Sequence, residues 1–401
     1  MIRSTGFDPA VHGFAFPNAF VDETTILPGG KPITTRGRCG GMAYLSLDHF
    51  FAGVPAPYLP RAHFAPERVP PDGHLVADAV RTRLFDSFKV LSALQFFTWS
   101  ALPDGDVLVV DGVHKQTHQD ELPKILRAID AGTPVPLGLV VAHDVRAVGT
   151  NHQVVAYGYE RTAAGTTLLI CDSNSPGAEV TLTPTADGAW QASNGPLWRG
   201  FFVQSYRRRK PVIRTTSPAD PAAAVRAGSV VTLAHVRTGR VLRSSTQRWA
   251  GAGSSGGREV TGVPVAGSMT RWVVSGPDEG APVRHGDAVH LRSTSTRSWL
   301  TSTRDVRSPL TGQQEVSAVP GETAPLGSAW RVEVDGATGT TGKAGAIGWT
   351  AGARVRLVHV STGVALHSHL RSDPALTFGR QEVTGFAGRD DNDWWTVLEL
   401  S

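Results

Sequence analysis

The chain has 401 residues, of which 40% are hydrophobic and 18% are charged, and its formal net charge at pH 7 is +4. This length corresponds to two or three domains at roughly 100–200 residues each. The apolar fraction and the small net charge exclude intrinsic disorder as the main state. No apolar run approaches the roughly 20 residues that a membrane-spanning helix needs, and residues 1–7 lack the apolar core of a secretory signal. We therefore expect no membrane span.

The two cysteines exclude a disulfide framework and a four-cysteine zinc site, and they are compatible with a reducing compartment such as the cytoplasm. Localisation is otherwise left open. Residues 1–210 carry 19 basic and 19 acidic residues, so the remainder carries 39 − 19 = 20 and 35 − 19 = 16. The one dense basic run, at 207–210, is typical of a solvated tail at a domain boundary. We therefore expect no nucleic-acid partner.

The first 210 residues mix helical and strand patterns. Apolar residues recur at helical spacing in 46–51, 75–101 and 121–131, and short β-rich runs follow at 137–142, 153–159, 166–171, 179–182 and 200–206. Helices followed by strands predict an α+β domain over residues 1–210. Residues 211–227 contain several prolines and an alanine run, which predicts a linker.

Cys39 stands in the motif Arg-Gly-Arg-Cys-Gly-Gly at 36–41, directly before a segment with helical spacing. The glycines permit a tight turn and the close approach of a substrate backbone. At a helix N-terminus, unpaired N–H groups and the helix dipole favour a thiolate, and two neighbouring arginines act in the same direction. The pattern therefore predicts a nucleophilic thiol at Cys39.

His152 begins an apolar strand pattern, and Asp172 follows the next strand, with Asn174 two residues later. A nucleophile, a base and an orienting acid at the ends of separate elements form a triad-like arrangement. We expect Cys39 to attack a carbonyl carbon and His152 to take up and return the proton. Asp172 is expected to orient the imidazole, with Asn174 as its substitute.

The order Cys, His, Asp or Asn, with the base 152 − 39 = 113 residues downstream, resembles the papain-like superfamily. The motif Asp-x-Asn-x-Pro-Gly at 172–177 is similar to bacterial papain-like and C39-type peptidase domains, and the resemblance covers residues 30–206. It implies a papain-like α+β fold and a cysteine peptidase, a thiol-dependent hydrolase of peptides or proteins that needs no cofactor. The chain departs from that pattern upstream of the nucleophile, because its first glutamine is Gln95. Backbone amides or Asn18 would then bind the oxyanion, and the loss of one such donor lowers the rate by about 10²–10³-fold.

Two alternatives stay open at this point. One is a non-catalytic binding protein on a degenerate papain-like scaffold. The other is an acyl-transfer enzyme of the transglutaminase or deamidase type, which uses the same three residue types. Cys171, at a strand end, is expected to be a buried core residue.

After the linker, helical spacing disappears and a repeat begins. Gly-x-x-Val-x-Leu starts at residues 228, 286 and 352, Glu-Val follows at 259, 315 and 382, and each repeat closes on an aromatic strand with Trp272, Trp330 or Trp395. Three units of about 60 residues, none of which can bury its apolar face alone, predict a closed threefold β-trefoil over residues 228–401.

The third repeat is the most specific, with Leu-His-Ser-His at 366–369, Gln-Glu-Val-Thr-Gly at 381–385 and Asp-Asp-Asn-Asp-Trp-Trp at 390–395. These motifs resemble the MIR domain, the trefoil module of protein O-mannosyltransferases, stromal-derived-factor-2-like proteins and inositol-trisphosphate and ryanodine receptors. The resemblance implies a glycan or protein ligand and a targeting role. His367 and His369 share a face of a strand, but no third ligand stands at a useful spacing, so no metal is assigned.

Overall fold

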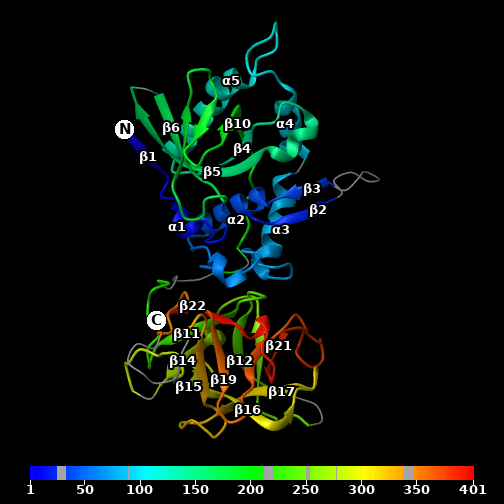
Figure 1. The fold of residues 1–401 in the computed structure, drawn as a ribbon, viewed down its shortest axis with the longest axis vertical. Helices are drawn as coiled ribbons and strands as arrows, with labels where there is room; N and C mark the ends of the chain where they lie inside the picture. The colour runs from blue at the N-terminus through cyan, green and yellow to red at the C-terminus, as the bar shows by residue number, and fades with distance from the viewer. Residues whose placement is uncertain are drawn as a thin grey trace. The chain divides into compact units, whose positions relative to one another are not determined.

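The computed structural model describes residues 1–24, 33–88, 90–163, 165–211, 213, 220–249, 253–276, 278–337 and 347–401. These residues are mostly β-structure and divide into two compact units (Figure 1). Unit 1 comprises Met1–Val69 and Ala77–Pro211, and unit 2 comprises Pro70–Val76 and Val212–Ser401. The domain limits predicted above, 1–210 and 228–401 with a linker at 211–227, stay predictions, since residues 212 and 214–219 lie outside the described residues.

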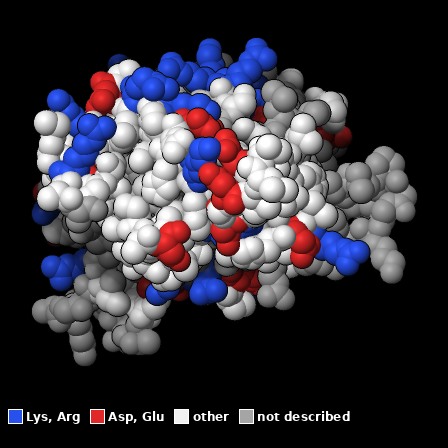
Figure 2. All heavy atoms as spheres, turned by 90° about the horizontal axis from the view of Figure 1, so that it is seen from above, with Lys and Arg blue, Asp and Glu red and all other residues white. Residues whose placement is uncertain are grey.

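The helices lie in the first 130 residues, and none of the described helices is long and apolar enough to cross a membrane. The α-helices are α1 (Pro9–His12), α2 (Cys39–Ala52), α3 (Leu75–Ser87), α4 (Val90–Ala101), α5 (Val113–Gln116) and α6 (Leu122–Asp130). Unit 1 also contains two 3₁₀ turns, η1 (Arg61–Phe64) and η3 (Val145–Thr150), and one π turn, η2 (Thr117–Glu121), among its described residues. The face of the molecule drawn in Figure 2 carries basic and acidic side chains beside one another. The absence of a nucleic-acid partner stays a prediction.

The strands of unit 1 form an eight-stranded sheet and a separate hairpin. The hairpin is β2 (Val21–Thr24) with β3 (Ile33–Arg36). The sheet runs in the order β10-β4-β5-β6-β7-β8-β9 with β1 on β5, and its strands are β1 (Ile2–Ser4), β4 (Val135–Val140), β5 (His152–Thr162), β6 (Gly165–Cys171), β7 (Val180–Pro184), β8 (Trp190–Ala192), β9 (Leu197–Trp198) and β10 (Gly200–Val203).

The antiparallel pairing of β5 with β6 positions the candidate site. Val155 of β5 lies opposite Cys171 of β6, so the start of β5 and the end of β6 meet at one edge of the sheet. All six residues of β4 are buried, and Val135, Leu137 and Leu139 pack with two isoleucines of α6 that lie one helical turn apart, Ile125 and Ile129. A covered sheet therefore holds His152 and the residues after Cys171 at a fixed place.

Helix α2 packs on β5 through Ala43 and Leu47. A Cβ atom built on Gly41 would overlap the carbonyl oxygen of Val80 in α3, and one built on Gly40 would overlap the side chain of Gln153. These glycines therefore allow the N-terminal turn of α2 to approach α3 and β5. They were expected to admit a substrate backbone, but helix packing alone requires them here.

Unit 2 contains a twelve-stranded sheet among its described residues, closed by the pairing of its first and last strands, β11 and β22. Its elements are β11 (Val230–His235), β12 (Val241–Arg248), β13 (Arg258–Val263), η4 (Ser268–Thr270), β14 (Arg271–Ser275), β15 (Ala288–Ser293), β16 (Ser298–Arg307), β17 (Gln314–Pro320), β18 (Trp330–Val334), β19 (Val355–His359), β20 (Ala365–Ser368), β21 (Gln381–Phe386), η5 (Asp391–Asp393) and β22 (Trp395–Leu400). The Glu-Val strands of the three repeats, β13, β17 and β21, pair with one another.

The three repeats contribute equivalent side chains to one core. The indole N–H groups of Trp272, Trp330 and Trp395 donate to the carbonyl oxygens of Leu242, Leu300 and Leu366 at 3.0, 3.1 and 2.8 Å, respectively. All six side chains are fully buried in one cluster. The repeated hydrogen bond gives each tryptophan its buried polar partner, and the prediction of a β-trefoil is confirmed in unit 2.

Candidate functional site

Cys39 is the first residue of α2, a helix of 14 residues whose N-cap, Arg38, makes no side-chain capping bond. Arg38 instead forms a bidentate ion pair with Asp22, at 2.7 and 2.8 Å, and its guanidinium lies 4.4 Å from the ring centroid of Phe20. Cys39 thus stands at a helix N-terminus, the position where a helix dipole favours negative charge, and its role as a nucleophile stays a prediction. The charge of Arg38 is compensated by Asp22, and the side chain of Arg36 lies outside the described residues.

His152 and Asp172 meet across the β5–β6 edge. The Nε2 atom of His152 lies 2.7 Å from Oδ1 of Asp172 and 3.3 Å from Nδ2 of Asn174. Asp172 also accepts from the backbone N–H of Asn174 and from the side-chain amide of Asn194, both at 2.8 Å. Asp172 is almost fully buried, and these bonds compensate its buried charge.

His152 carries a positive charge in this setting. Its burial acts to lower the pKa, but the adjacent Cys39 and Asp172, as charges and as hydrogen-bond partners, outweigh burial and raise the pKa to about 10. Burial acts to raise the pKa of Asp172, yet its bonds to His152, Asn174 and Asn194 hold that pKa below its usual value. His152 is therefore a buried cation in contact with Cys39 and Asp172.

A cavity of about 440 Å³ opens beside these groups. Cys39, His152 and Asn174 line it, together with Asn18 and Trp198. The Trp198 indole stacks on the His152 ring at 6.0 Å between centroids. The side-chain oxygen of Asn18 accepts a hydrogen bond from the backbone N–H of Arg38 at 2.5 Å. This bond holds the side-chain amide of Asn18 in the wall of the cavity that Cys39 also lines.

The structure thus brings together all four residues predicted from the sequence: Cys39, His152, Asp172 and Asn174. Their catalytic roles stay predictions. Sequence reasoning missed Asn194, which stands in the turn between β8 and β9, where no pattern marks it. Cys171 is partly buried in the wall of a different cavity, and burial raises its pKa to about 12.

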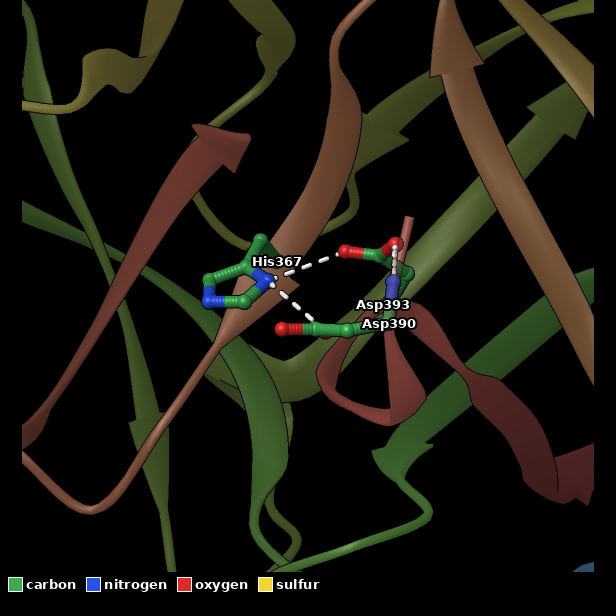
Figure 3. Close-up of side chains that lie close together, drawn as sticks. All are labelled: His367, Asp390 and Asp393. Carbon is green, nitrogen blue, oxygen red and sulfur yellow. Dashed lines mark hydrogen bonds and ion pairs between the residues drawn. The ribbon is translucent and has the colours of Figure 1, made fainter. Parts of the chain in front are cut away.

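Unit 2 holds a cluster whose residue types suit a metal ion (Figure 3). Nδ1 of His367 lies 2.9 Å from Asp393 Oδ1 and 3.7 Å from Asp390 Oδ1. However, Asp390 caps the turn through the N–H of Asn392, and Asp393 accepts from the N–H of Asp390 and lies 3.7 Å from Nε of Arg356. The turn itself and a guanidinium already use these carboxylates, so we assign the cluster to structure.

Unit 2 also contains a cavity of about 420 Å³ with a polar lining. Its walls are formed by Val230, Ala266, Gly267, Ser268, Arg271, Thr294 and Glu399. A guanidinium, a carboxylate and two hydroxyls supply both hydrogen-bond donors and acceptors.

The chain is similar to stromal cell-derived factor 2 proteins. It is 33% identical over 180 residues to the stromal cell-derived factor 2-like protein of Arabidopsis thaliana, which covers 43% of this chain and 77% of the relative. It is 34% identical over 185 residues to stromal cell-derived factor 2 of Bos taurus, covering 44% of this chain and 81% of the relative. The chain belongs to the stromal cell-derived factor 2-like family.

No family model matches the chain. Among solved structures, the SDF2-like protein of Arabidopsis thaliana is 28% identical and covers 45% of this chain and 97% of that chain, with a TM-score of 0.40. The protein O-mannosyltransferase Pmt1-Pmt2 complex of S. cerevisiae bound to the sugar donor is 28% identical and covers 47% of this chain and 27% of that chain, with a TM-score of 0.41.

The relatives correct the functional prediction made from Cys39, His152, Asp172 and Asn174. They are SDF2-like proteins with a MIR trefoil and are not peptidases, so the predictions of a cysteine peptidase, a thiol hydrolase and an enzyme are wrong. The physical reason is that motif order and strand ends predict which side chains meet. They do not predict whether a bound carbonyl compound is turned over.

Proposed function

We propose that this SDF2-like chain is a non-catalytic binding protein. Its MIR-like trefoil contacts a glycan or protein ligand, and unit 1 is a degenerate papain-like scaffold that contributes a second binding pocket. The observation that carries the proposal is the match to SDF2 proteins, which spans 77–84% of the length of the relatives from Arabidopsis thaliana, Bos taurus and Dictyostelium discoideum.

The polar cavity of unit 2 supports a glycan ligand. Arg271 and Glu399 are its charged residues, and Ser268 and Thr294 add hydroxyls. Sugar hydroxyls both donate and accept hydrogen bonds, so a binding site for them needs a few placed groups of both kinds. A protein ligand with polar side chains at the contact would use the same groups.

The arrangement of unit 1 supports the degenerate papain-like scaffold. A thiol at a helix start, a histidine at a strand start and an acid after the neighbouring strand occur in the order that suggested this family. In a binding protein these groups contact the ligand without turning it over. The side-chain amides of Asn18 and Asn174 can donate hydrogen bonds to a carbonyl or carboxylate oxygen in the 440 Å³ cavity.

The trefoil part is tested with the full-length protein on a glycan microarray, followed by titration of the glycan bound most strongly. Arg271→Ala and Glu399→Gln are each expected to raise the Kd at least tenfold, since each leaves sugar hydroxyls without a partner. Arg331→Ala is the matched control, because this arginine lies in β18 outside the cavity. A Kd that changes equally in all three variants, or no glycan binding at all, contradicts the glycan ligand.

The absence of turnover is tested separately. The full chain is incubated with a library of fluorogenic peptides, and product formation is compared with that of Cys39→Ser. Equal background rates are expected. Turnover by the wild type above that of Cys39→Ser would overturn the non-catalytic assignment.

A further inference from the structure

The sulfur of Cys39 is accessible to small molecules. Cys39 is only partly buried, and it lines the 440 Å³ cavity together with His152, Asn174 and Trp198. A hydroperoxide is much smaller than this cavity. Access therefore does not limit its reaction with the sulfur.

Two independent features stabilise the thiolate form in this cavity. One is the N-terminus of α2, whose first N–H groups have no partner within the helix. The other is the imidazolium of His152, held in place by its 2.7 Å contact with Asp172 and its stacking on Trp198. The thiolate, and not the thiol, is the form that reacts with peroxides.

The only other cysteine of the chain is poorly suited to react with an oxidised Cys39. Cys171 is free, lines a different cavity together with Gly13 and Phe14, and stays protonated at neutral pH because burial raises its pKa. A sulfenic acid at Cys39 would therefore lack a resolving thiolate within the chain.

We infer that Cys39 is a redox modification site, at which a hydroperoxide converts the thiolate beside His152 into a lasting sulfenic acid. The thiolate sulfur attacks one peroxide oxygen, the O–O bond breaks, and the sulfur loses two electrons. With hydrogen peroxide, the departing hydroxide takes the proton of His152, so the products are Cys–SOH, water and neutral imidazole.

This oxidation changes the charge of the pocket. Its effect on ligand affinity rests on the binding role proposed for unit 1. Oxidation replaces a thiolate with a neutral group and leaves His152 without that ion-pair partner. A ligand that binds the charged pair in the reduced protein would bind the oxidised protein differently. The chemical step itself is measured without the ligand, so failure of the proposed binding function and failure of this inference are distinguishable.

The test uses the full-length protein with hydrogen peroxide and dimedone, which traps sulfenic acids, and mass spectrometry quantifies the adduct at each cysteine. Cys39 should be labelled at least tenfold faster than Cys171, which serves as the internal control. His152→Gln should slow labelling of Cys39 at pH 7 at least tenfold, whereas His118→Gln, which removes a histidine stacked on Trp190, should leave it unchanged. Equal labelling of both cysteines, or no effect of His152→Gln, overturns the inference.

A second measurement needs no variant and so does not depend on variant folding. The inference predicts that the labelling rate of wild-type Cys39 changes less than threefold between pH 7 and pH 9, because the α2 N-terminus and the adjacent His152 favour its reactive form. An ordinary thiol titrates near pH 8.5, so its rate rises more than tenfold over this range. A rise of that size at Cys39 contradicts a preformed thiolate and overturns the inference.

Discussion

Gly40 and Gly41 hold the first turn of α2 against its neighbours, and through that turn they position Cys39. Gly41 faces the backbone of Val80 in α3, and Gly40 faces the side chain of Gln153, the residue after His152. The close approach therefore joins the helix that carries the thiol to the strand that carries the imidazole. At this scale a single methyl group is enough to disturb the site.

Gly41→Ala should lower the free energy of unfolding of unit 1 by about 1–3 kcal/mol. The added Cβ overlaps a backbone carbonyl oxygen that cannot rotate away, and overpacking of this kind costs more than the roughly 1 kcal/mol that alanine gains over glycine within a helix. Urea unfolding followed by circular dichroism measures the change. Gly105→Ala is the control, since a Cβ there meets nothing within 4 Å. A stability of Gly41→Ala equal to that of the control would refute the packing role.

Some members of the candidate site follow from sequence, and others do not. His152 and Asp172 stand at the ends of apolar strand patterns, and Cys39 precedes a helical pattern, so local periodicity locates all three. Asn194 bonds to Asp172 from the turn between β8 and β9, a contact set by tertiary structure alone. Likewise, Arg38 stands next to Cys39 in the sequence, but its ion pair with Asp22 depends on a hairpin that the pattern did not predict.

Among the elements, the trefoil strands were the most predictable, because the same pattern of apolar residues and tryptophan occurs three times in the sequence. Each repeat places valine or leucine at alternate positions, and a tryptophan 29 or 30 residues after the acceptor leucine supplies the N–H donor for the same bond. Unit 1 has no repeat. The segment 75–101 forms two helices, α3 and α4, and short strands such as β9 carry no readable alternation. Val225 lies in the segment that was predicted as a linker, but its side chain is buried in the trefoil core.

The buried histidine of the first repeat, His235 in β11, predicts a pH dependence of unit 2. Burial and the nearby His367, His369 and Arg237 lower its pKa to about 3, although its hydrogen bond to the carbonyl oxygen of Asn392 acts in the opposite direction. In the unfolded chain a histidine titrates near 6.5. Between these values the unfolded state binds a proton that the folded state does not, so stability falls as the pH falls below 6.5.

Proton uptake at His235 in the unfolded chain should therefore lower the free energy of unfolding of unit 2 by about 2 kcal/mol between pH 7 and pH 5. His74, also in unit 2, has a pKa lowered to about 3, mainly by burial, and adds to the loss in the wild type. Urea unfolding of the full chain, followed by tryptophan fluorescence, should therefore show a loss that is about 2 kcal/mol smaller in His235→Gln than in the wild type. Burial is the main cause of the raised pKa values of Glu315 and Glu382, which act in the opposite direction as the pH falls through those raised values toward 4.5. Identical pH profiles for the wild type and the variant would refute the assignment to His235.

At the scale of the whole molecule, the chain consists of two units that each bury a separate core. The core of unit 2 is the threefold cluster around Trp272, Trp330 and Trp395, and the main core of unit 1 lies between α6 and the eight-stranded sheet. The match to SDF2 relatives covers 43–45% of the chain, so fewer than half of its residues account for the family membership. Because each unit buries its own core, the trefoil and the thiol-bearing unit can vary in stability independently.

Differential scanning calorimetry of the full chain should show two transitions, since domains with their own cores unfold as separate cooperative units. Gly41→Ala should lower only the transition of unit 1. Leu300→Ala, which empties a fully buried position of the trefoil core, should lower only the transition of unit 2, by about 5–15 °C, because such a truncation costs about 2–5 kcal/mol and each kcal/mol shifts the midpoint by about 2–4 °C at this size. A single transition that both variants lower together would mean that the two units unfold as one cooperative structure.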